Sequence, residues 1–102
     1  MEYRELLLEC LGEKMEALGR LYGGGVNEQE DLIEYNQLNK FDDEELTYLF
    51  IINADKDDIR WLYNHEDCDW TSFNQGVWLY IEIHTFGDFL ELILNGNICL
   101  TL

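Results

Sequence analysis

The sequence predicts an α+β domain, with helices in the first two thirds of the chain and a small sheet near its C-terminus. Apolar residues recur with a helical period in the N-terminal part, acidic capping patterns precede several short apolar runs, and the last third is rich in β-branched and aromatic residues. The 102 residues suit one domain, which we expect to span 1–102. With 47% hydrophobic residues, the chain has enough apolar surface to fold.

The first predicted helix covers 2–22. One side of it is apolar and consists of Leu7, Leu11, Met15, Leu18 and Tyr22. The opposite side carries glutamates that fall within about 80° of one another on a helix of 3.6 residues per turn, namely Glu2, Glu5, Glu9, Glu13 and Glu16. We expect Gly23, Gly24 and Gly25 to end this helix, because glycine readily adopts the left-handed cap conformation.

Two further helices are predicted from their starts. Asn27 and Glu30 have the spacing of a capping box, which favours a helix over 28–38. Asp42 is followed by three consecutive acids, and carboxylates are favourable both at the cap and in the first turn of a helix. The apolar residues that follow fit a helix or a strand by periodicity alone. The cap decides for a helix over 43–53.

The same pattern predicts a fourth helix. Asp55 and Asp58 precede an apolar run, as at the start of the previous helix, and favour a helix over 56–63. The polar residues 64–76 are then expected to form a loop.

The C-terminal third contains the predicted sheet. Residues 77–85 are rich in β-branched and aromatic side chains and form the best predicted strand. A helix is predicted over 86–94 from its apolar spacing, although Asn95 and Gly96 between two apolar runs are also typical of a hairpin. Residues 97–102 are expected to form a second strand.

The charge of the chain is large and unevenly distributed. Twenty-two acidic and six basic residues give a formal net charge of −16. Residues 28–69 alone hold fourteen acidic residues against three basic ones. Phosphates of DNA, RNA and anionic lipids would be repelled, so a basic protein is the expected partner, without direct contact to nucleic acid or membrane.

The cysteines indicate a reducing compartment. Cys10, Cys68 and Cys99 are odd in number and widely spaced, which argues against a disulfide framework. The first residues have no signal-peptide pattern, and no apolar run approaches the ~18 residues of a membrane span. We therefore expect a protein of the cytosol, that of a host cell if the gene is phage-encoded.

Catalytic and metal-binding patterns are weak. Ser72 is the only serine and lies in no nucleophile motif, so we do not expect an enzyme. His65 and Cys68 have zinc-ligand spacing, but a structural zinc site needs four ligands and no second pair follows. No cofactor is predicted, and a small metal-binding protein using His65 and Cys68 remains the third hypothesis for function.

The acidic arrays are the candidate partner-binding site. The carboxylates expected to contact a partner are Glu5, Glu9, Glu13, Glu16, Asp42, Asp43, Glu44, Glu45, Asp55, Asp57, Asp58, Glu66, Asp67 and Asp69. Their spacing along the first helix is comparable to that of phosphates along a nucleic-acid strand. Aromatic residues lie between them, and one or two left exposed are expected to anchor the interface; the candidates are Tyr35, Tyr48, Trp61, Tyr63 and Trp70.

In size, charge and its carboxylate arrays, such as the glutamates between Glu2 and Glu16, the chain resembles the small acidic inhibitors that phages encode against host nucleases, the anti-CRISPR and anti-restriction DNA-mimic proteins. The resemblance implies an inhibitor that fills the basic nucleic-acid-binding cleft of a nuclease or CRISPR-type effector. It is one of composition and carries over no residue roles. An immunity protein or acidic adaptor that binds a basic partner at an exosite is the alternative, and the apolar C-terminal third leaves dimerisation open.

Overall fold

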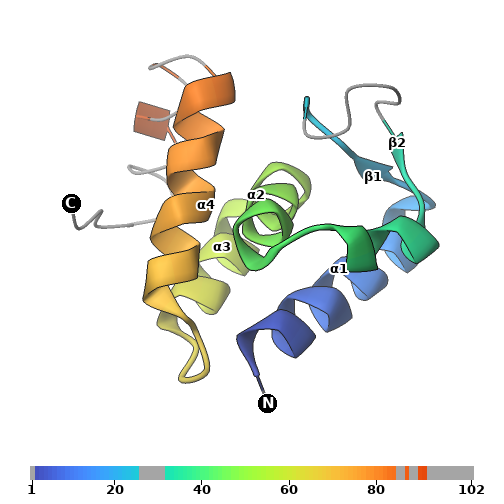
Figure 1. Cartoon of the computed structure of the whole chain (residues 1–102), viewed down its shortest axis with the longest axis horizontal. Coiled ribbons are helices and arrows are strands. Elements are labelled where there is room, and N and C mark those ends of the chain that lie inside the picture. The colour runs from blue at the N-terminus through green and yellow to red at the C-terminus, as the bar shows by residue number, and fades with distance from the viewer. Residues whose placement is uncertain (1, 26–31, 85–86, 88–89, 92–102) are drawn as a thin grey trace.

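The computed structural model describes residues 2–25, 32–84, 87, 90 and 91 (Figure 1). Its elements are α1 Tyr3–Leu18, β1 Leu21–Tyr22, β2 Leu32–Ile33, the 3-10 helix η1 Tyr35–Lys40, α2 Asp43–Asn53, α3 Lys56–Asn64 and α4 Trp70–Ile83. The fold is therefore α+β in the broad sense but dominated by helices. None of the helices in this part of the chain combines the length and the apolar composition that crossing a membrane requires.

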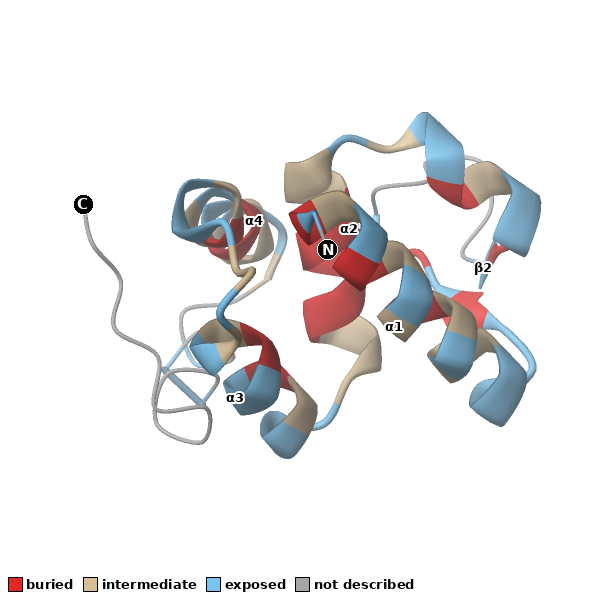
Figure 2. Cartoon of the chain, turned by 90° about the horizontal axis from the view of Figure 1, so that it is seen from below, coloured by how far each residue is buried: buried red, intermediate tan, exposed pale blue. Residues whose placement is uncertain are grey.

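Helix α2 lies at the centre of the molecule, between α1 and α4 (Figure 1). Six consecutive residues of this helix, Leu46–Ile51, are buried. A helix that is buried on all sides must be covered by neighbours on all sides, and α1, α4 and the short sheet supply that cover. Figure 2 shows the buried positions gathered on α2 and around it.

The helices predicted from acidic caps are confirmed. Helix α2 spans the predicted 43–53, and α3 extends the predicted 56–63 by one residue. Both begin with a reciprocal capping box, in which an aspartate and the residue three positions later each accept the other's backbone N–H. Because these bonds are local, the sequence alone was sufficient to place both helices.

The prediction for the end of the first helix was wrong. Helix α1 ends at Leu18, and Gly19 adopts a left-handed conformation with φ of 76°. The Gly19 N–H donates to the Met15 carbonyl at 2.7 Å, which closes the last turn. The chain therefore leaves the helix at its first suitable glycine, four residues before Gly23.

The α-helix predicted over 28–38 is not observed in the described part of that range, residues 32–38. Residues 28–31 lie outside the described residues, while Leu32–Ile33 form strand β2 and η1 begins at Tyr35. Strand β2 pairs antiparallel with β1, with Leu21 opposite Ile33. That pairing buries one apolar residue from each strand, Leu21 and Ile33.

The largest correction concerns the strand predicted over 77–85 and the loop predicted over 64–76. The loop is confirmed only at 65–69, because helix α4 occupies 70–76 of the predicted loop and 77–83 of the predicted strand. Its N-cap is Asp69, whose carboxylate accepts the N–H groups of Thr71 and Ser72 at 3.1 and 3.3 Å. Its inward positions follow a helical period and are Phe73, Gly76, Val77, Tyr80 and Ile81. This i, i+3, i+4, i+7, i+8 spacing outweighs the β-propensity of the individual residues.

Gly76 explains how α4 approaches α2 so closely. A Cβ atom at this position would lie 2.5 Å from the Cβ of Thr47 and 2.9 Å from the backbone oxygen of Glu44, both on α2. Of the predicted C-terminal elements, the helix over 86–94 falls mostly outside the described residues. The strand over 97–102, and with it the predicted C-terminal sheet, falls outside them entirely; the sheet that is described is β1 and β2.

Candidate partner-binding surface

Helix α1 presents a row of exposed carboxylates. Glu5, Glu9, Glu13 and Glu16 are all exposed, and we call these four residues the acidic ridge. The opposite side of the helix is buried against the core through Tyr3, Leu6, Leu7 and Leu11. Within the part of the chain that the structure describes, no ridge carboxylate has a hydrogen-bond or ion-pair partner. The ridge is thus a line of unsatisfied negative charge.

The N-terminal end of α1 is held in place by contacts to α2. The Tyr3 hydroxyl lies 2.7 Å from Thr47 Oγ1, which itself donates to the Asp43 carbonyl. Arg4 forms an ion pair with the Asp43 carboxylate at 3.0 Å. Burial raises the pKa of the Tyr3 hydroxyl far above its ordinary value, so it remains a neutral hydrogen-bond donor. These bonds orient α1 and hence the ridge.

The basic residues of α1 do not neutralise the ridge. Arg4 is directed to Asp43, and Lys14 forms an ion pair with Asp58 of α3 at 2.5 Å. The hydrogen bond to Asp58 raises the pKa of Lys14 despite an opposing effect of burial. Both cations therefore connect α1 to its neighbours, and Lys14, although it lines the same hollow as Glu13, is paired with Asp58 rather than with the ridge.

A groove runs between α1 and α3 on one side of the ridge. One hollow of about 460 Å³ has a lining that includes Cys10, Glu13, Lys14, Phe50, Asp58 and Trp61. A second hollow of about 350 Å³ shares Cys10, Glu13 and Trp61 and extends to Glu9, His65 and Glu66. We call the two together the α1–α3 groove. Its walls are partly aromatic and its rim is acidic.

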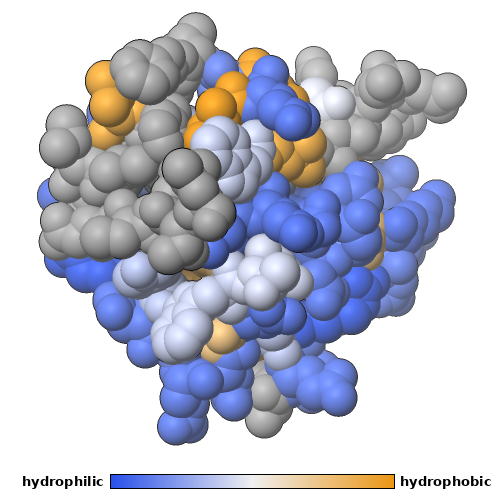
Figure 3. All heavy atoms as spheres, turned by 60° about the vertical axis from the view of Figure 1, so that its left-hand side comes forward, coloured by the Kyte–Doolittle hydropathy of each residue, from blue (hydrophilic) through white to orange (hydrophobic). Residues whose placement is uncertain are grey.

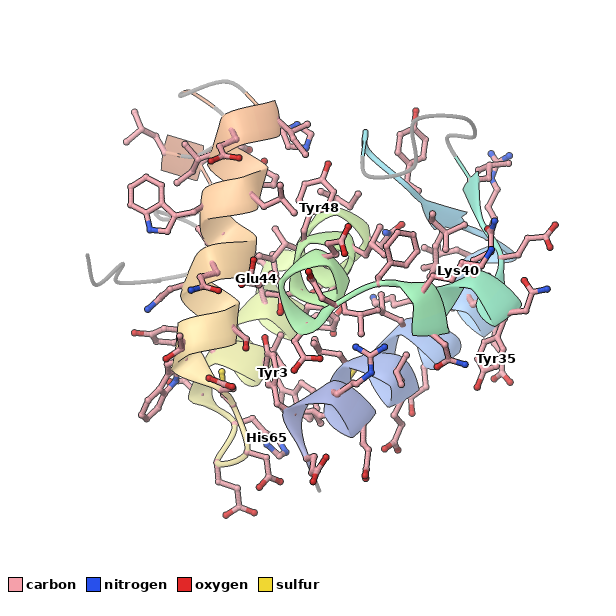
Figure 4. The ribbon with its side chains drawn as sticks, viewed as in Figure 1. Tyr3, Tyr35, Lys40, Glu44, Tyr48 and His65 are labelled. Atoms are coloured by element: carbon pink, nitrogen blue, oxygen red, sulfur yellow. The ribbon has the colours of Figure 1, made fainter. Side chains whose placement is uncertain are left out.

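Another groove lies on the opposite side of the ridge, between α1 and η1. It encloses about 340 Å³, and its lining includes Leu8, Gly12, Met15 and Tyr35 together with three ridge glutamates. Tyr35 is 67% exposed and lies beside α1 (Figure 4). A Cβ atom at Gly12 would lie 3.4 Å from the Tyr35 ring, so the glycine allows this ring to approach the helix. Glu13 borders both grooves.

Several predicted site carboxylates instead start helices. Asp42 accepts the Glu45 N–H at 2.8 Å, and Glu45 accepts the Asp42 N–H at 3.1 Å. Asp55 and Asp58 form the equivalent pair at 2.8 and 3.4 Å, and Asp69 caps α4. These hydrogen bonds lower the pKa of Asp55 below its ordinary value. These five residues therefore form hydrogen bonds that cap the N-termini of α2, α3 and α4.

The other predicted carboxylates are spread over the surface. Asp43 pairs with Arg4, and Asp57 lies 3.9 Å from Arg60 within α3. The remaining three are Glu44, half-buried on α2 (Figure 4), Glu66, exposed at the α1–α3 groove, and Asp67, half-buried beside His65. The structure therefore brings Glu9 and Glu13 of the ridge together with Asp58, Glu66 and Asp67 at the α1–α3 groove, and places Asp42–Glu45 at the start of α2.

The aromatic candidates separate into two groups. Trp61 is 48% exposed and lies in the α1–α3 groove, and Tyr35 lines the other groove. Trp70 is exposed as well, at the start of α4. Tyr48 is fully buried and Tyr63 half-buried. Only tertiary structure brought Trp61 and Tyr35 to the two sides of one ridge.

Helix α4 presents a different surface. Glu82 is its only charged residue, and its large exposed side chains are Trp70, Trp78 and Ile83. Figure 3 shows the side of the molecule that carries this helix. Hydrophobic residues are gathered mainly toward the top of this view, and hydrophilic residues cover much of the rest. The acidic ridge and α4 are thus chemically distinct surfaces.

The residues of the metal hypothesis have other environments. The His65 ring accepts the Asp67 N–H through Nδ1 at 3.1 Å and forms a T-shaped contact with Trp61. Among the described residues, no group of three His, Cys, Asp or Glu side chains has a metal-binding arrangement. Burial, followed by the charge of Asp69, raises the pKa of Cys68 to about 12. Burial, with Glu13 and Glu9, raises that of Cys10 to about 11.

Comparison with known proteins adds no relative. The chain matches no protein-family model, no curated protein and no solved structure.

Proposed function

We propose that this protein binds a basic surface of a partner protein through the acidic ridge, and that the bound surface is one that normally holds nucleic acid. The observation that carries the proposal is a set of four exposed glutamates without a partner among the described residues, of which Glu9 and Glu13 border an aromatic-lined groove on each side. Lysine and arginine side chains would satisfy these carboxylates, and the aromatic residues would supply apolar contact area beside them.

The spacing of the ridge supports a nucleic-acid-binding partner. Successive ridge glutamates are three or four residues apart, which corresponds to about 4.5–6 Å along the helix axis. A protein that grips phosphates carries cations at comparable intervals. Its target would be the cleft of a nuclease or CRISPR-type effector, which the bound inhibitor would close to DNA or RNA.

Titration with a fluorescent hexalysine peptide tests charge-based binding by the ridge. We expect measurable affinity at low salt that falls steeply as the salt concentration rises, because the interaction is between solvent-exposed charges. A variant with Glu5, Glu9 and Glu13 replaced by glutamine should bind markedly more weakly. Fluorescence anisotropy measures both effects.

A matched control separates the ridge from net charge. The substitutions Asp57→Asn, Glu82→Gln and Glu91→Gln also remove three negative charges, from exposed positions outside the ridge. If the ridge is the binding surface, this control binds hexalysine nearly as well as the wild type. Equal weakening by both triple variants would show that only net charge matters, and the proposal would fail.

Competition decides between a cleft and an exosite. Once a basic partner has been isolated, duplex DNA or RNA should displace the protein from it if the ridge fills the nucleic-acid cleft. If the partner binds nucleic acid and this protein at the same time, the nucleic-acid-mimic hypothesis is wrong and binding at an exosite takes its place.

A further inference from the structure

We infer that the α1–α3 groove receives an arginine side chain of the partner, whose guanidinium group stacks on Trp61 and pairs with Glu13. This inference rests on the proposed function and adds to it a residue type and a pocket. Trp61 and Glu13 line both hollows of the groove, so one side chain inserted there reaches both.

The walls of the groove suit the long stem of a basic side chain. Cys10, Ala17 and Phe50 contribute apolar atoms beside Trp61. Arginine buries its methylene groups along such surfaces while its charged end remains near polar groups. The hollow of about 460 Å³ is large enough for one such side chain.

The charge of the groove selects a cation. Asp58 is already paired with Lys14, whereas Glu9, Glu13 and Glu66 have no partner among the residues described. An anion would be repelled by all three carboxylates, and a second copy of this chain would bring more negative charge. A positively charged group from a different protein is the occupant that complements this site.

Trp61 favours arginine over lysine. Its indole is 48% exposed and forms a T-shaped contact with the His65 ring, with ring centroids 5.0 Å apart and planes inclined by 66°. A planar guanidinium stacks on an aromatic face and keeps its N–H groups free to bind a carboxylate in the same plane. A lysine ammonium is a compact, strongly hydrated charge and gains less from the same ring.

The test compares hexa-arginine with hexalysine, two peptides of equal charge, by NMR titration of the ¹⁵N-labelled protein. We expect hexa-arginine to bind about three- to tenfold more tightly and to shift the indole N–H resonance of Trp61. Trp61→Leu should reduce the affinity for hexa-arginine to that for hexalysine and leave the latter nearly unchanged. Trp61→Phe should give an intermediate preference, because phenylalanine is a weaker cation acceptor.

Trp78→Leu is the matched control, since Trp78 is 39% exposed on α4 and lines neither groove. It should retain the preference for arginine. Equal affinities for the two peptides, with shifts confined to ridge amides, would overturn the arginine pocket and leave ridge binding intact. If neither hexa-arginine nor hexalysine binds, both proposals are overturned.

Discussion

Glu9 on the acidic ridge and Asp42 at the start of α2 are both exposed carboxylates, yet their surroundings differ. Asp42 accepts a backbone N–H at 2.8 Å and is part of a reciprocal capping box. Glu9 has no partner among the described residues and borders the grooves on both sides of the ridge. The net charge of −16 counts the two residues equally. Their positions on a helix give Asp42 a capping role and leave Glu9 exposed, without a partner among the described residues.

The physical basis of this division is the helix terminus. The first N–H groups of a helix have no intrahelical acceptor, so an aspartate placed there gains hydrogen bonds and a favourable dipole interaction. A glutamate in the middle of a helix finds no free N–H nearby and projects into solvent. In this protein the segment with the densest charge, 28–69, also contains the aspartate caps of α2, α3 and α4. Much of its acidity is therefore used locally.

Charge reversal on the ridge should have the largest effect. We expect Glu5→Lys, Glu9→Lys and Glu13→Lys together to weaken hexalysine binding at least about 30-fold, or about 2 kcal/mol. The free energy of unfolding, measured with urea, should not decrease, because these residues have no partner to lose among the described residues. A destabilised triple variant would show that the ridge contributes to folding, and the distinction between ridge and capping carboxylates would then be wrong.

Loss of a cap should have the opposite profile. Asp42→Ala should lower the free energy of unfolding by about 1 kcal/mol, while Asp42→Asn, which retains a capping oxygen, should cost less. Hexalysine affinity should change little in either variant. If Asp42→Ala weakens peptide binding as strongly as a ridge substitution, the capping acids belong to the binding surface after all.

Removal of the cation between the two regions should have a smaller effect. Lys14→Met eliminates the ion pair with Asp58, whose two side chains are 27% and 37% exposed. We expect a loss of about 0.5 kcal/mol in unfolding free energy, because partly exposed pairs contribute little. Hexalysine should bind slightly more tightly, since a positive charge has left the groove. A weaker complex would mean that Lys14 supports the groove's shape.

Acid titration should give the smallest effect and isolate a single cap. The pKa of Asp55 is lowered from its ordinary value of 3.8, first by its backbone hydrogen bond from Asp58. Its ionised form therefore adds stability above the unfolded-state pKa, and this contribution is lost as the pH falls through the folded-state pKa. Urea unfolding of wild type and Asp55→Asn should converge as the pH drops below about 4. A difference that is independent of pH would contradict the capping role of the Asp55 charge.

The elements that were predicted correctly depend on contacts within a few residues. Helices α2 and α3 follow from Asp42 and Asp55, whose partners are three positions along the chain. The exposed glutamates of α1 follow from helical periodicity in the same way. The β-propensity of the residues in 77–83 predicted a strand there, whereas the spacing of Phe73, Gly76 and Val77 is that of the helix observed. Burial against α2 determines the conformation there.

The groove could not be derived from the sequence, because its two walls are far apart along the chain. Glu13 and Trp61 are separated by the end of α1, the sheet, η1, α2 and the first half of α3, and only the packing of α1 and α3 around the central helix brings them together. A partial signal exists in α3, where Trp61 and His65 are four residues apart at its C-terminal end. This spacing indicates that the two side chains share a face, but it does not predict that α1 forms the opposite wall of the groove.

The sequence by itself determined where charge accumulates, which helices start at acidic caps and that α1 has a glutamate side. These properties arise from hydrogen bonds and periodicities that extend over less than two helical turns. Tertiary structure decided that α4 is a helix, that Arg4 and Lys14 are directed away from the ridge and that Trp61 and Tyr35 lie beside it. Each of these depends on the burial of apolar surface between distant segments, whose free energy belongs to the assembled core rather than to any local stretch of chain.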